Sequence, residues 1–286
     1  NLGAFTTLIS IFFFWGFVAA SNDILIPVFK KALDLSQLES QLISLAFYIA
    51  YTVGSLLYFG ISSFIKKDIL NVIGYRNGLS LGLIISALGT LLFIPASNNE
   101  SFPLLISGLF IVGLGFSLQQ IAANPLAIQM GDPSKGNMRL SLAGGINNVG
   151  TTIGPVIVSF AIFGSLSSGE TNLNLQSVQT PYLFLGAAFV IAAILFKFSS
   201  VPDRLGEKNE SNNSGNILAT LKYPQVVLGM IAIFLYVGVE VSTASNLPEF
   251  MKQELGTEES GVAPFVSLFW ASLMIGRWTS AAGAFN

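Results

Sequence analysis

Two carboxylates stand out in this sequence because each lies within an apolar stretch. Asp23 is near the end of the first such stretch, and Glu240 lies deep in the seventh. A charged side chain inside a bilayer is costly unless it is paired or faces water, so each is a candidate for binding a proton or a polar ligand. Two other interpretations stay open. Asp23 can cap or snorkel near a membrane surface, and Glu240, with no basic residue in its neighbouring turns, can hydrogen-bond to another helix.

Side-chain amides and hydroxyls lie in the same apolar stretches. Gln120 and Asn124 are four residues apart and therefore share one face of a helix. Asn147 and Asn148 follow a glycine pair, and the sequence does not decide which of the two faces inward. Amides donate and accept hydrogen bonds, which suits a ligand with many hydroxyl groups, whereas bonding between helices is the alternative. The candidate binding residues are Asn22, Gln119, Gln120, Asn124, Asn147, Asn148, Ser242 and Asn246.

The composition disfavours several classes of protein. There is no His and no Cys, which removes imidazole bases, thiol nucleophiles, disulfides and the usual zinc ligands. We therefore expect no enzyme, no metal and no cofactor. No basic block points to nucleic acid. Charged residues make up 10% and hydrophobic residues 52% of the 286 residues, which leaves too few charges to cover the surface of a soluble protein.

The apolar stretches predict an all-α membrane protein, because roughly 20 apolar residues are enough to cross a bilayer as a helix. Eight stretches qualify, or nearly so: 7–29, 42–64, 78–97, 103–129, 140–164, 181–196, 225–248 and 261–284. Basic residues concentrate in the connections on one side, which predicts that this side and the N-terminus are cytoplasmic. These residues are Lys66, Lys67, Arg76, Lys135, Arg139, Lys197, Arg204, Lys208 and Lys222, against Lys30, Lys31 and Lys252 on the other side. Arg277, near the inner end of the eighth stretch, is expected to snorkel or to pair at a cytoplasmic gate.

The chain divides into a six-helix part at 1–198, a hydrophilic linker at 199–224 and two further helices at 225–286. A shift of 221 residues places Pro27 on Pro248 and Lys31 on Lys252, which predicts that the second part restarts the first. This organisation is typical of two parallel six-helix repeats. Because the chain begins without Met and stops after the eighth helix, we expect that four more helices belong to the fold.

Several motifs in chain order resemble the fucose/galactose/glucose:proton symporter family of the major facilitator superfamily. They are Asn22-Asp23-Ile24-Leu25-Ile26-Pro27, Ala122-Ala123-Asn124-Pro125, Arg139-Leu140-Ser141-Leu142, Tyr236-Val237-Gly238-Val239-Glu240 and Gly276-Arg277. Gln120 and Glu240 are similar to the glucose/galactose branch, whereas the fucose branch has Glu at the first of these positions. The fucose branch also has Gln where this chain has Gly144.

The resemblance implies a twelve-helix fold and proton-coupled uptake of a sugar by alternating access in a bacterial inner membrane. It implies that Asp23 is the matched carboxylate, and we infer that Glu240 shares the proton-coupling role. The expected partners are a small sugar and the lipid bilayer. Alternatives from the same and other classes are a sodium-coupled or uncoupled carrier of another solute, and a structural subunit of a larger membrane complex.

Overall fold

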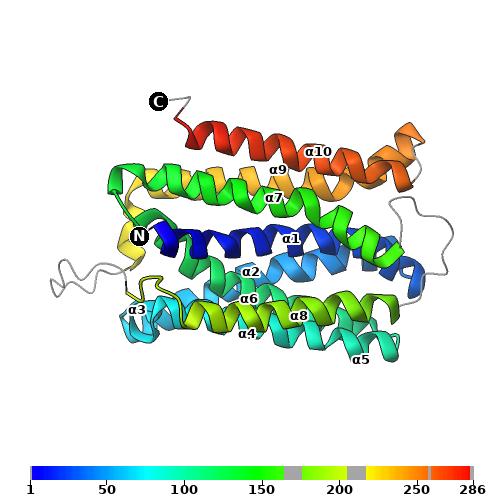
Figure 1. Ribbon diagram of the computed structural model, residues 1–286, viewed down its shortest axis with the longest axis horizontal. Helices are drawn as coiled ribbons and strands as arrows, with labels where there is room; N and C mark the ends of the chain where they lie inside the picture. The colour runs from blue at the N-terminus through cyan, green and yellow to red at the C-terminus, as the bar shows by residue number, and fades with distance from the viewer. Residues whose placement is uncertain (1, 164–175, 205–216, 257–258, 284–286) are drawn as a thin grey trace.

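The protein is a bundle of long helices, described here by a computed structural model for residues 2–163, 176–204, 217–256 and 259–283. Every regular element in these ranges is helical, and α1 begins at the same end of the bundle at which α10 ends (Figure 1). In chain order the elements are α1 (Leu2–Ala32), α2 (Gln37–Ile65), α3 (Ile69–Ile73), α4 (Tyr75–Leu91), α5 (Phe93–Asn98), α6 (Phe102–Gln129), η1 (Pro133–Lys135), α7 (Gly136–Phe163), α8 (Gln176–Lys197), η2 (Ile217–Lys222), α9 (Pro224–Leu255) and α10 (Glu259–Ala281).

Each of the eight expected spans coincides with a long helix or, for the third, with α4 followed by α5. Within the described residues, six helical segments are long and apolar enough to cross a membrane: Gly3–Ala20, Gln37–Ile65, Tyr75–Asn98, Phe102–Gln129, Gln179–Lys197 and Pro224–Leu247. The other two expected spans coincide with α7 and α10.

The outer surface of the bundle is strongly apolar. Phe64, Phe198 and Phe234 are 89%, 81% and 78% exposed. The interior is equally apolar, with Phe116 and Phe189 fully buried and their rings in edge contact, 5.8 Å between centroids. A surface this apolar is stable in lipid and not in water, so the helices are membrane spans.

Glycines bring the helices of the first part into backbone contact. A Cβ added at Gly16 of α1 would lie 1.9 Å from the backbone oxygen of Asn147 in α7, and one at Gly150 would lie 2.3 Å from the backbone oxygen of Phe13. No larger residue fits at either crossing. Close approach of this kind supplies the van der Waals contact that holds helices together where no hydrophobic effect does.

The α9–α10 pair packs against the preceding helices, α1 to α8, through contacts of α10 with α7. In the part of the chain that the structure describes, α10 packs along α7 while α9 packs against α10 and η2 (Figure 1). Gly145 leaves the space that the Trp278 indole fills, and Ser267 Oγ donates to the backbone oxygen of Thr152 at 3.3 Å. An 18-residue window of α9 contains no buried residue. The domain boundaries and the internal repeat stay predictions, since the side chains of Pro27 and Pro248 lie outside the described residues.

Side chains distant in sequence fasten two helix ends. Gly74 precedes α4 and has no side chain to cap it, and Asp203, just beyond α8, supplies the cap instead. Its Oδ1 accepts from the Arg76 backbone N–H at 3.2 Å, and its backbone oxygen accepts from Tyr75 N–H at 2.8 Å. At the end of α6, the buried guanidinium of Arg139 donates to the backbone oxygens of Ala127 (3.0 Å) and Ile128. Both contacts satisfy backbone groups that a helix end leaves free.

Candidate functional site

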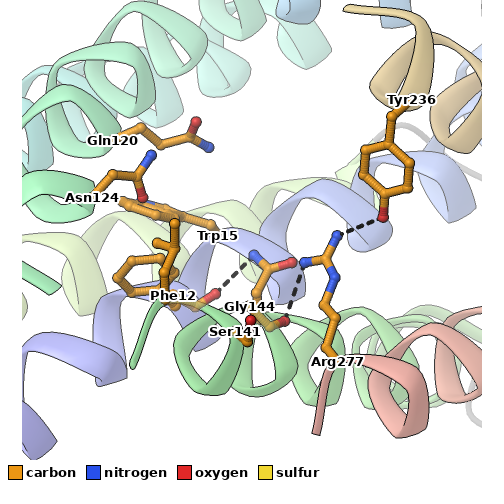
Figure 2. Close-up of a pocket in the computed structure, with 10 residues that line it drawn as sticks. Phe12, Trp15, Gln120, Asn124, Ser141, Gly144, Tyr236 and Arg277 are labelled. Atoms are coloured by element: carbon orange, nitrogen blue, oxygen red, sulfur yellow. Dashed lines mark hydrogen bonds between the residues drawn. The ribbon is translucent and has the colours of Figure 1, made fainter. Parts of the chain in front are cut away.

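A cavity of about 390 Å³ is lined by side chains from α1, α6, α7, α9 and α10. Figure 2 shows the amides of Gln120 and Asn124 on α6 across this cavity from Arg277 on α10. Its lining combines amide, hydroxyl and aromatic groups with this single cation. The lining residues are Phe12, Trp15, Gln120, Asn124, Leu140, Ser141, Gly144, Asn147, Tyr236 and Arg277.

The shared face of Gln120 and Asn124 faces the cavity, as their spacing predicts. Gln120 Nε2 lies 3.4 Å from the hydroxyl of Tyr51, to which it donates. Within the described residues, the carbonyl oxygen of Gln120 and the side-chain amide of Asn124 make no hydrogen bond. Each can therefore bond to a ligand hydroxyl as donor or acceptor.

The structure separates the two neighbouring asparagines of α7. Asn147 lines the cavity and donates from Nδ2 to the backbone oxygen of Phe12 at 2.9 Å, which leaves its Oδ1 for a ligand. Asn148 is fully buried and does not line the cavity, and neither its Nδ2 nor its Oδ1 has a hydrogen-bond partner among the described residues. Asn147 is thus the asparagine that the structure brings into the site.

Glu240 is paired, although the neighbouring turns of its own helix contain no cation. Arg277 of α10 donates from Nη2 to Glu240 Oε1 at 3.2 Å and Oε2 at 3.4 Å, and to the hydroxyl of Tyr236 at 3.0 Å. Arg277 Nη1 also donates to the backbone oxygen of Gly144, at 3.4 Å. Arg277 is therefore paired, and its guanidinium contacts both α9 and α7, while its role at a cytoplasmic gate stays a prediction. Its side chain is 28% exposed and that of Glu240 11%.

Gly144 is what lets Arg277 reach the cavity. A Cβ at this position would lie 2.9 Å from Arg277 Nη1. The space that a longer α7 side chain would take therefore holds the guanidinium.

Besides Asn148, three predicted binding residues lie elsewhere. Gln119 is fully buried, faces away from the cavity and hydrogen-bonds to Trp15 and Ser86. Ser242 and Asn246 are exposed on α9 and bond to backbone oxygens of their own helix, that of Val239 at 3.3 Å and that of Ser242 at 2.8 Å. The structure does not bring these three into the site. Asn22 and Asp23 belong to α1, but their side chains lie outside the described residues.

Sequence reasoning missed Phe12, Ser141 and Tyr236 as cavity residues. Ser141 precedes Gly144 by three positions and Tyr236 precedes Glu240 by four, so helical periodicity places each on the face of a residue already singled out. The described residues contain no group of three or more Asp, Glu, His or Cys side chains that could hold a metal ion.

The chain matches the family described as the Major Facilitator Superfamily over residues 3–285. A glucose/galactose transporter of Brucella abortus (strain 9-941) is 35% identical over 98% of this chain and 66% of its own length. The L-fucose-proton symporter of Escherichia coli K12 is 29% identical over 96% of this chain and 66% of its own length. The chain therefore spans slightly less than two thirds of the length of these relatives.

The fold is similar as well. A crystal structure of the E. coli fucose:proton symporter FucP superposes with a TM-score of 0.76 and 26% sequence identity, covering 99% of this chain and 71% of that one. The higher identity to the glucose/galactose transporter confirms the expected branch. The helices, the match along almost the whole chain and the structural similarity agree: the chain belongs to the Major Facilitator Superfamily.

Proposed function

We propose that the protein is a secondary active transporter that takes up a hexose-type sugar together with protons by alternating access. The relatives with these names, a glucose/galactose transporter and an L-fucose-proton symporter, support the substrate class and the coupling ion. The bacterial source of these relatives supports a bacterial inner membrane, and the concentration of basic residues in alternate connections supports an N-terminus in the cytoplasm.

The observation that carries the proposal is the chemistry of the cavity. Its volume of about 390 Å³ lies within the range of small-molecule sites. Gln120, Asn124 and Asn147 present amides to it, and Trp15 presents an aromatic ring. A sugar has hydroxyls that both donate and accept, and C–H faces that pack on aromatic rings, so both kinds of group find partners here.

The Glu240–Arg277 pair gives the coupling a physical basis. With Glu240 ionised, its carboxylate holds Arg277 in place while the guanidinium also bonds to Gly144 of α7. Protonation of Glu240 removes half of the ion pair and loosens this contact between α7 and the α9–α10 pair. The guanidinium is then left without its carboxylate partner and has to find another acceptor, which favours a rearrangement of the helices around it. Release to the cytoplasm follows when Glu240 loses the proton.

Asp23 is the second proposed proton-coupling group, on the strength of its position in the family motif. Asn22 beside it and Asn148 on α7 are proposed as further sugar contacts in another state of the transport cycle. Each proton that enters across 100 mV releases about 2.3 kcal/mol, which supports roughly fifty-fold accumulation at one proton per sugar.

Uptake of radiolabelled glucose and galactose by proteoliposomes containing the complete protein tests the proposal. We expect an inward proton gradient to drive accumulation, a protonophore to abolish it and a sodium gradient to have no effect. Accumulation driven by sodium would overturn the proton coupling. Absence of any hexose flux under all gradients would overturn the substrate class.

Glu240→Gln separates coupling from binding. We expect this variant to exchange labelled for unlabelled sugar across the membrane but to lose gradient-driven accumulation, because the side chain stays polar and can no longer change charge. Glu254→Gln is the matched control, since Glu254 is exposed near the end of α9. Accumulation by Glu240→Gln at the rate of the unaltered protein would show that Glu240 is not the coupling group.

A further inference from the structure

A chain of hydrogen bonds leads from the cavity wall into α6 and then α4. Trp15 Nε1 donates to Gln119 Oε1 at 2.9 Å, and Gln119 Nε2 donates to Ser86 Oγ at 3.1 Å. Ser86 Oγ in turn donates to the backbone oxygen of Val112 at 3.2 Å. Gln119 and Ser86 are fully buried, and Trp15 is 4% exposed.

The chemistry of the groups fixes the direction of this chain. An indole nitrogen only donates, so the atom of Gln119 facing Trp15 has to be the carbonyl oxygen. The NH₂ group of Gln119 then faces Ser86. The Ser86 hydroxyl accepts a hydrogen bond from this group and donates one to the backbone oxygen of Val112. The orientation of the Gln119 amide therefore follows from the indole alone.

Two glycines make the room that this chain needs. A Cβ at Gly82 of α4 would lie 2.7 Å from Gln119 Cγ, and a Cβ at Gly115 of α6 would lie 2.2 Å from Ser86 Oγ. Any side chain at either position would push the amide or the hydroxyl out of place. The glycines at the contact between α4 and α6 thus leave the space that the Gln119 and Ser86 side chains occupy.

An amide inside an apolar bundle costs free energy unless it is bonded, and Gln119 does not line the cavity. The group that it contacts on the cavity side is the Trp15 indole. We propose that Gln119 is a positioning residue that anchors the N–H edge of Trp15, so that the remaining part of the ring forms the apolar wall of the ligand cavity. Phe12 supports the same wall, with its ring centroid 4.5 Å from that of Trp15. The proposal rests on the proposed function only in taking a hexose as the ligand.

A spectroscopic test addresses the anchor without any sugar. In a full-length protein with Trp270→Phe and Trp278→Phe, Trp15 is the remaining indole of the described chain, and its ¹⁵N–¹H signal reports the hydrogen bond. We expect Gln119→Leu to move the indole proton upfield and to speed its exchange with deuterated water. The matched control is Gln179→Leu, on α8 and bonded to Ser97 and Asn98, which leaves the signal unchanged. An indole signal unaffected by Gln119→Leu would overturn the proposal.

Transport kinetics test what the anchor does. Loss of one hydrogen bond is worth about 1 kcal/mol, so we expect Gln119→Leu to raise the KM for sugar by about five-fold with little change in the maximal rate. Ser86→Ala keeps the bond between Trp15 and Gln119 and removes only the second anchor, so a smaller increase, about two-fold, is expected. This variant also serves if Gln119→Leu does not fold.

A double-mutant cycle separates positioning from a general structural role. If Gln119 acts through Trp15, adding Gln119→Leu to Trp15→Phe has no further effect on KM. Additive effects of the two substitutions would overturn the proposal. If the unaltered protein transports no hexose, the proposed function fails, while the indole signal still decides whether Gln119 anchors Trp15.

Discussion

At the scale of single residues, the absence of a side chain at Gly144 is as important as the polar groups around the cavity. Arg277 fits against α7 because no Cβ stands in its way, and from there it reaches Glu240, Tyr236 and the Gly144 backbone oxygen. The position of Arg277 therefore depends on its partners on α7 and α9 and on the absence of a Cβ at Gly144.

Gly144→Ala is expected to slow proton-coupled uptake by about three-fold, because a Cβ placed 2.9 Å from Nη1 makes the guanidinium shift from its present position. Gly238→Ala provides the comparison. It lies two positions from Glu240 on α9, and a Cβ there would meet nothing within 4 Å. Initial rates of sugar uptake in proteoliposomes measure both. Equal rates for the two variants would show that the glycine has no part in placing Arg277.

At the scale of the elements, helix ends are secured by residues far away in the chain. α4 begins after Gly74, whose φ of +92° no other residue type adopts easily, and its cap comes from Asp203. A cap of this type stabilises a helix by about 1 kcal/mol when it lies next to the helix in sequence. Here the same bond also ties the end of α8 to the start of α4.

Asp203→Ala is expected to lower the free energy of unfolding by about 1 kcal/mol, since the Arg76 backbone N–H loses its acceptor. Gly74→Ala is expected to cost more, because it combines a strained φ with a Cβ 2.4 Å from Asp203 Oδ1. Thermal unfolding of the purified protein in detergent measures both. Glu254→Ala, exposed on α9, should leave the midpoint unchanged. A midpoint for Asp203→Ala that matches the control would argue against the cap.

At the scale of the whole molecule, the chain has an orientation that its own composition makes easy to measure. Its 286 residues contain no Cys, so a single introduced cysteine is the one maleimide site within them. We expect Asn99→Cys, between α5 and α6, to react with a membrane-impermeant maleimide in intact cells. Lys135→Cys, between α6 and α7, is expected to react only after the membrane is broken. The opposite pattern would reverse the predicted topology.

Features that depend on residues close together in the sequence could be predicted, whereas those that depend on contacts between helices could not. The helices and the face shared by Gln120 and Asn124 depend on residues within a few turns, and both were predictable. Neighbouring residues point about 100° apart around a helix, so Gln119 and Gln120 face different ways, and only the packing of α1 and α4 decides which one meets the cavity. The partner of Glu240 comes from another helix, so inspection of its own turns missed Arg277.

The fastening of Asp203 to α4 also has a mechanical consequence. Asp203 lies six residues after the end of α8, in the segment that leads toward α9, and it bonds to Tyr75 and Arg76 at the start of α4. The two bonds hold the segment that follows α8 against the first turn of α4, so α4 and α8 are tied together at this end of the bundle. A rearrangement that separates these two ends has to break both bonds first.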